Sequence, residues 1–192
     1  MKYKDGIICL ETEWEHTVKN NRVSLHTKPL LEFIGNAWGC KTIYRRIATR
    51  NELQYYLNRF NNVEYDDLSI IYLSFHGDTH SIILEGENKD NCSISLEELS
   101  KMSNGVFRDR FVHFSSCRTL IGSNKELEKF KNDTGALYIS GYSTSVDSIQ
   151  SAINDIAYFD QIFRHQKKRA LIRTAMEKYY QGLDNKLGFK II

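Results

Sequence analysis

Short apolar runs alternate along the chain with segments whose apolar residues recur at helical spacing. The runs at 70–75 and 111–116 show no polar alternation, which is typical of strands covered on both faces in a parallel sheet. Further strands are expected at 6–10, 41–47 and 136–140, and a last one at 187–192 at an edge of the sheet. A small hairpin is expected over 81–88.

Helices are expected between the strands. A capping box, in which Glu98 follows Ser95 by three positions, marks one helix start, and Pro29 precedes another. The segment from Ile149 to Phe163 carries apolar residues at helical spacing, which indicates a long amphipathic helix. The expected helices are 30–37, 51–60, 95–102, 125–131, 149–163 and 169–181.

This alternation predicts an α/β fold with a mostly parallel central sheet and helices on both faces. A chain of 192 residues is long enough for a full core, and it contains one proline and no repeat or linker that would divide it. We therefore expect a single domain over residues 1–192.

Charge and cysteine usage narrow the classes of function. Lys and Arg exceed Asp and Glu by only 26 to 24, so no strong field would recruit nucleic acid or an anionic membrane. The four cysteines are widely separated, which argues against a zinc site and a disulfide framework. With no secretory signal or membrane span in the sequence, we expect a cytoplasmic protein without metal or cofactor.

Two of the apolar strands end in residues that can carry chemistry. The strand at 70–75 leads into His76-Gly77, and the strand at 111–116 leads into Cys117. The carboxyl ends of parallel strands meet at one edge of the sheet, so an imidazole and a thiol are expected to face one crevice. A thiol beside an imidazole base is the arrangement of nucleophilic catalysis by cysteine.

These stretches resemble the caspase-like cysteine peptidases of the His-Gly…Cys kind, and especially their bacterial CHAT-type branch. The resemblance rests on Ser74-Phe75-His76-Gly77, on Ser115-Ser116-Cys117, and on the strand 136–142 that is followed by Asp147. It implies a caspase-like sandwich and a cysteine endopeptidase of a bacterial defence or programmed-death pathway. Cys117 would be the nucleophile, His76 the acid and base, and the N–H groups of Gly77 and Cys117 the oxyanion hole. The partners implied are a protein substrate and a separate activating or sensor protein.

In caspase-like folds the residue before the scissile bond is read near the ends of the first strand and of the strand after the nucleophile. Those regions hold Glu11, Glu13 and Asp147, which would bind a basic side chain through charge-assisted hydrogen bonds. Two other interpretations remain open, in which Glu13 is a solvated loop residue and Asp147 caps the following helix.

Rival functions come from other classes of protein. The first is a catalytically inactive caspase-like interaction module in which Cys117 is packed. A flavodoxin-like binding domain is weakened because no glycine-rich phosphate loop follows the first strand. His113 lies inside an apolar strand and is interpreted as a hydrogen-bonded core histidine. A metal pair of His76 and His80 is disfavoured, because Gly77 and a turn separate them.

Overall fold

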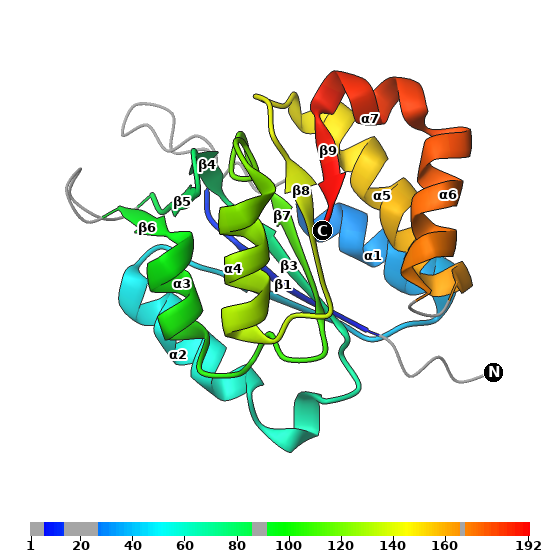
Figure 1. The fold of residues 1–192 in the computed structure, drawn as a ribbon. Coiled ribbons are helices and arrows are strands. Elements are labelled where there is room, and N and C mark those ends of the chain that lie inside the picture. Colours follow the sequence, from blue (N-terminus) through cyan, green and yellow to red (C-terminus); the bar gives the residue numbers. More distant parts are fainter. Residues whose placement is uncertain (1–5, 14–26, 86–91, 166–167) are drawn as a thin grey trace, which may run out of the picture.

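The computed structural model describes residues 6–13, 27–85, 92–165 and 168–192 (Figure 1). Its centre is a six-stranded sheet in the order β2-β1-β3-β7-β8-β9. The strands are β1 (Ile7–Glu11), β2 (Thr42–Arg46), β3 (Ile70–Ser74), β7 (Phe111–Ser115), β8 (Tyr138–Tyr142) and β9 (Phe189–Ile191). All neighbours pair in parallel except β9, which lies antiparallel to β8 at one edge. The mostly parallel sheet and the edge strand are therefore confirmed.

Helices cover both faces of this sheet, as Figure 1 shows. One side carries α2 (Arg50–Phe60), α3 (Leu96–Ser103) and α4 (Asn124–Thr134). The other side carries α1 (Thr27–Trp38), α5 (Ser148–His165), α6 (Arg169–Tyr179) and α7 (Gln181–Leu187). A short 3₁₀ helix, η1 (Val63–Tyr65), precedes β3. This arrangement confirms the predicted α/β class and is consistent with a caspase-like sandwich.

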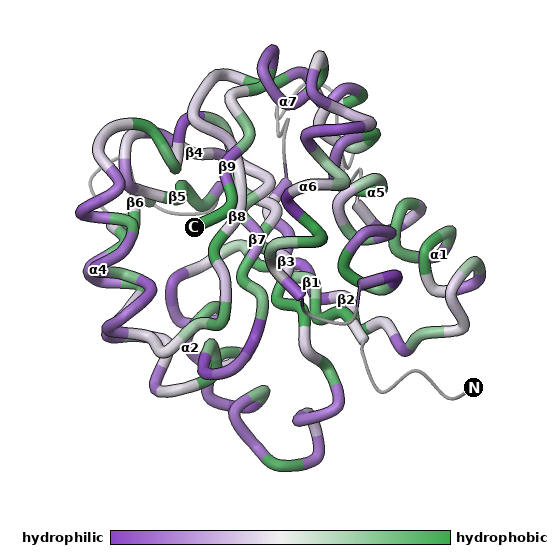
Figure 2. The backbone as a smooth tube through the Cα atoms, turned by 45° about the vertical axis from the view of Figure 1, so that its right-hand side comes forward, coloured by the Kyte–Doolittle hydropathy of each residue, from purple (hydrophilic) through white to green (hydrophobic). Residues whose placement is uncertain are grey.

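The central strands send alternate side chains into two separate hydrophobic cores. In β1, Ile8 and Leu10 pack into the core under α2, α3 and α4, whereas Ile7 and Cys9 pack into the core under α1, α5 and α6. Figure 2 shows apolar strands at the centre and polar residues on many of the helical turns around them. Burial on both faces explains why these strands have no polar alternation.

Local cap chemistry sets the start of α3 where the sequence predicts it, whereas α1 begins at Thr27, before Pro29 and not after it. The Ser95 hydroxyl accepts from the Glu98 N–H, and the Glu98 carboxylate accepts from the Ser95 N–H, so the expected capping box starts α3. The helix predicted over about 169–181 begins as predicted and ends at Tyr179. It breaks at Tyr180, whose φ of −128° is not helical, and the chain continues as α7.

A second, three-stranded sheet lies beyond the carboxyl end of β3. It consists of β4 (His76–Asp78), β5 (Ser81–Ile83) and β6 (Ser93–Ser95), all antiparallel. The sequence predicts a hairpin over 81–88, of which 86–88 lie outside the described residues, and a turn at Asp78-Thr79. Instead β5 pairs with β4 on one side and β6 on the other, which places His76 and Gly77 in a strand.

Candidate active site

The register of the central sheet brings the two predicted chemical residues to one edge. β3 and β7 are parallel neighbours, and Ser74 lies opposite Ser115. His76 and Cys117 each follow two residues after these partners. The two therefore leave the carboxyl ends of adjacent strands, as the sequence predicts.

Gly77 packs directly against the turn that carries Cys117. A methyl group built at Gly77 would lie 2.4 Å from the carbonyl oxygen of Cys117 and 2.4 Å from Oγ1 of Thr119. Both distances are far inside van der Waals contact, so only glycine fits without movement of the backbone. The strand that contains His76 is thus held in contact with the turn of the thiol.

Thr119 ties that turn to the small sheet. Its buried hydroxyl donates to the carbonyl of Ser81 in β5 at 3.0 Å and lies 2.7 Å from the hydroxyl of Ser116. On the surface, Arg118 pairs with Asp78 of β4 at 3.7 Å. These contacts hold the small sheet against the Cys117 turn through residues other than His76.

Cys117 is half-buried at the start of a sharp turn. The next residue, Arg118, adopts a left-handed conformation with φ 59°, which is uncommon for a residue other than glycine and tends to occur at functional sites. The Cys117 sulfur accepts a hydrogen bond from the Val146 N–H at 3.4 Å. Cys9 is fully buried, and this burial, together with Glu11 and Asp155, raises the pKa of its thiol well above the ordinary value.

The carboxylate of Glu11 is buried and hydrogen-bonded within the protein. One oxygen accepts from the backbone N–H of Thr27 at 3.0 Å and from its hydroxyl at 2.7 Å. The other oxygen accepts from the Tyr44 hydroxyl at 2.8 Å. These bonds join the end of β1 to the start of α1 and to β2. A part for Glu11 in substrate binding stays a prediction.

Glu13 and Asp147 also have structural partners. Glu13 is 3% exposed and pairs with Arg46 at 3.0 Å, so the interpretation as a solvated loop residue is wrong. The exposed Asp147 accepts from the N–H groups of Ile149 and Gln150 at the start of α5, which confirms its interpretation as a helix cap. Substrate contact by either residue stays a prediction.

A buried polar network lies beneath this edge of the sheet. The His113 ring is fully buried and faces Ser140 at 2.9 Å and Asp155 of α5 at 2.7 Å, so the interpretation of His113 as a core histidine is confirmed. Asp155 also accepts from three hydroxyl groups, those of Tyr72, Ser115 and Tyr142. Burial alone would raise the pKa of the Asp155 carboxyl, but His113 and the hydroxyl donors outweigh burial and lower it.

Sequence reasoning missed Thr119 and Asp155. The sequence could have identified Asp155, because it follows Ala152 by three positions and precedes Phe159 by four. This spacing places Asp155 on the apolar face of α5. An acidic residue on such a stripe requires a buried partner. No sequence pattern could have identified Thr119, because its role depends on the small sheet, whose strands are only three residues long.

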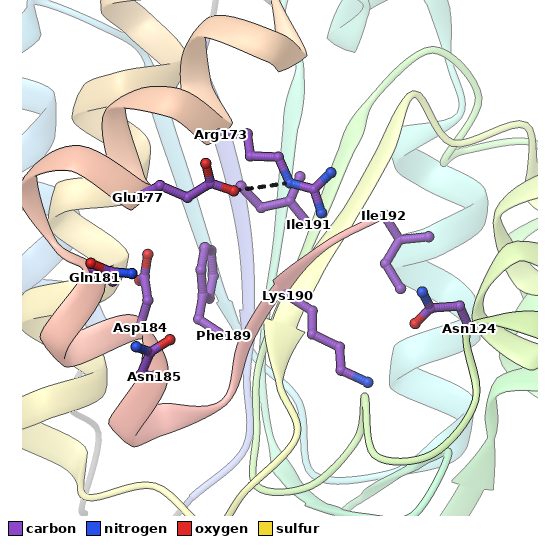
Figure 3. A pocket seen from close by; sticks show the side chains of 10 residues that line it. All are labelled: Asn124, Arg173, Glu177, Gln181, Asp184, Asn185, Phe189, Lys190, Ile191 and Ile192. Carbon is purple, nitrogen blue, oxygen red and sulfur yellow. Dashed lines mark ion pairs between the residues drawn. The ribbon is translucent and has the colours of Figure 1, made fainter.

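Two cavities of different character lie near these elements. The smaller, of about 80 Å³, lies between the ends of β3 and β7 and the first turns of α1 and α5, where Ser74, Ser115, Val146 and Asp155 line it. The larger, of about 400 Å³, lies between α6, α7 and the edge strand β9 (Figure 3).

The charges of the larger cavity are mixed. Arg173 pairs with Glu177 at 3.6 Å, and Lys190 donates to the Gly122 carbonyl. Burial raises the pKa of Asp184, on its wall, to about 6. The residues that line this cavity do not include any of the predicted catalytic groups.

The described ranges contain neither a cluster of metal ligands nor a helix suited to span a membrane. There, the His, Cys, Asp and Glu side chains form no group of three or more that could hold a metal ion. Among the helices that the structure describes, none has the length and apolarity that a membrane span requires.

The fold and site define an α/β sandwich with a histidine and a cysteine at the ends of adjacent parallel strands. Compared with known families, residues 4–192 match the profile of a family of unknown function, DUF6642, and the chain belongs to that family. A comparison with curated proteins gave no significant match.

Proposed function

We propose that the protein is a cysteine endopeptidase in which Cys117 and His76 act as a dyad. The observation that carries this proposal is the close packing of Gly77 against the Cys117 turn, because it holds the imidazole-bearing strand beside the half-buried thiol. The left-handed backbone of Arg118 and the hydrogen bond from Thr119 to Ser81 support the proposal, since both position the same turn.

In the proposed reaction, the Cys117 sulfur attacks the scissile carbonyl carbon while His76 takes the thiol proton. The carbonyl oxygen becomes an oxyanion that the N–H groups of Gly77 and Cys117 would stabilise. Collapse of the intermediate breaks the C–N bond, and His76 gives its proton to the leaving amine. Water, deprotonated by His76, then hydrolyses the thioester and restores the thiol.

The second candidate is a catalytically inactive interaction module of the same fold. The hydrogen bond from the Val146 N–H to the Cys117 sulfur favours it, because a thiol used in packing would be held in this way. Partial exposure of Cys117 favours the peptidase, since a purely structural cysteine is usually fully buried, as Cys9 is.

The biological setting belongs to the same proposal. The near-neutral charge and the absence of a cysteine pair motif support a cytoplasmic enzyme that acts on a protein substrate rather than on nucleic acid. By the resemblance to caspase-like peptidases, it would act in a bacterial defence or programmed-death pathway and respond to a separate activating or sensor protein.

The test is a cleavage assay on a peptide library made by proteome digestion, with new peptide ends mapped by mass spectrometry. Cys117→Ala and His76→Ala should each abolish the new ends, and the double variant should be no worse than either, because a dyad acts as a unit. Cys92→Ala, another partly buried cysteine, serves as the control and should cut normally. If wild type cuts nothing, or if His76→Ala cuts normally, the interaction module is favoured.

A further inference from the structure

The small cavity beside Cys117 has a position suited to reading a substrate. Val146 both lines it and donates its N–H to the Cys117 sulfur, so a residue that lines the cavity also contacts the thiol. Ser115, on another wall, precedes Cys117 by only two residues. A side chain next to the bond attacked by Cys117 could therefore enter this cavity.

The cavity is small. Its volume of about 80 Å³ is roughly half that of an apolar cavity of about 150 Å³ that binds benzene. This space holds the methyl group of alanine or the hydroxymethyl group of serine. The long side chains of arginine and lysine do not fit without rearrangement of α1 or α5.

The cavity wall offers no free charged group to a charged substrate side chain. Among the described residues that line the cavity, Asp155 is the charged one, and each of its oxygens already accepts two hydrogen bonds. A basic side chain would have to displace these donors. An acidic side chain would meet the buried carboxylate and no cation, which costs free energy because like charges repel.

The remaining polar groups on the wall are hydroxyls. Thr27 and Ser74 face each other at 2.8 Å, Ser115 donates to Asp155, and Ser151 donates to the Ser148 carbonyl. Hydroxyl groups have acceptor capacity left after donating one bond, so they can accept from a small hydroxyl side chain. The wall is thus neutral and weakly polar.

We propose that this cavity receives the side chain before the scissile bond and selects alanine or serine over arginine, lysine and aspartate. The inference rests on the proposed peptidase function. It differs from the preference for a basic residue that Glu11, Glu13 and Asp147 suggest in the sequence. Those carboxylates hold Thr27, Arg46 and the start of α5, and none of them lies among the residues that line the cavity.

The experiment uses the full chain and a set of peptidyl acyloxymethyl ketones that differ only in the residue before the reactive group: Gly, Ala, Ser, Arg or Asp. The rate at which each probe modifies Cys117 is followed by mass spectrometry. The Ala and Ser probes should modify Cys117 at least about ten times faster than the Arg and Asp probes do. This ratio is expected for a pocket that discriminates between side chains by size and charge.

A variant with a filled cavity is the second part of the experiment. Ala152 lies on the cavity wall, and Ala152→Leu should fill the cavity. The Ala and Ser probes should then modify Cys117 about tenfold more slowly. The rate of the Gly probe should stay unchanged, because glycine has no side chain to place in the cavity. An unchanged Gly probe also shows that the variant is folded. Ala170→Leu, at an exposed position of α6, is the matched control and should not alter any rate.

The outcomes separate the two proposals. If the Arg or Asp probe is fastest, or if Ala152→Leu leaves the Ala probe unchanged, the cavity assignment is overturned while the peptidase proposal stands. If every peptide probe modifies Cys117 no faster than iodoacetamide does, the peptidase proposal fails and the assignment fails with it.

Discussion

Replacement of Asp155 by asparagine is the most demanding test of the buried network. The side chains of Asp155 and His113 are both 0% exposed and lie 2.7 Å apart. Asparagine keeps the shape, and the Tyr72 and Ser115 hydroxyls can rotate to accept from its amide. The negative charge that accepts four hydrogen bonds is nevertheless lost, and a hydrogen bond to a charged group contributes about 1.5–3 kcal/mol.

That cost is a large share of the 5–15 kcal/mol that typically stabilises a domain, with roughly 2–4 °C of melting temperature lost per kcal/mol in a chain of this size. We therefore expect Asp155→Asn to melt about 3–12 °C below wild type at pH 7, as followed by circular dichroism. Asp160→Asn on the same helix is the control. It removes an exposed pair with Arg164 and should cost less than about 1 kcal/mol.

The pH dependence has a defined sign. Because the folded state lowers the pKa of Asp155, its contribution is present above the unfolded value of about 3.9 and is lost as pH falls through the folded value. The difference between wild type and Asp155→Asn should therefore shrink below about pH 4. A variant within 1 kcal/mol of wild type at pH 7 would refute the reasoning, as would a difference that grows in acid.

Four further predictions concern single contacts. Thr119→Val removes the tie between the Cys117 turn and β5, so unfolding experiments should show a loss of about 1–3 kcal/mol, and peptide cleavage should fall as well. Gly77→Ala should cost about 1–3 kcal/mol and slow cleavage, because its methyl group collides with the turn; normal cleavage would contradict this packing. Asp147→Ala should cost about 1 kcal/mol in denaturant melts through the lost cap of α5, and an unchanged rate of Cys117 alkylation would separate it from the site. Burial raises the pKa of Asp184 to about 6, so the stability of wild type should fall as pH rises from about 4 to 6. The stability of Asp184→Asn should not change in this way, and this variant should melt at a higher temperature than wild type at pH 7.5.

The central fold is readable because the sequence pattern and the packing agree. Residues 70–75 and 111–116 show no polar alternation, and the folded strands β3 and β7 are buried on both faces. Ser95 and Glu98 fix the start of α3 through contacts within one turn. Such features depend on neighbours in sequence or on general burial, and both can be seen in the chain itself.

The details of the site depend on contacts between distant segments. Glu11 and Glu13 stand where a substrate-binding acid is expected, but their partners Thr27 and Arg46 come from elements that only the fold brings close. The β4 strand at His76 is set by pairing with β5 and by the space left at Gly77. Neither interaction has a local pattern, so the sequence predicts the position of the dyad but not the groups that surround it.

The central claim is that His76 activates Cys117, and the rate of Cys117 alkylation tests it most directly. Limiting iodoacetamide is applied at pH 6.5, where an unassisted thiol with the ordinary pKa of about 8.5 is only about 1% thiolate. Wild-type Cys117 should react faster than Cys40 or Cys92, and His76→Asn should slow it by about tenfold or more.

The matched control is His80→Asn, because asparagine tolerates the left-handed backbone of His80 at φ 54°. It should leave the rate of Cys117 alkylation unchanged. Equal rates in wild type and His76→Asn, or alkylation of Cys40 or Cys92 as fast as that of Cys117, would contradict the proposed dyad.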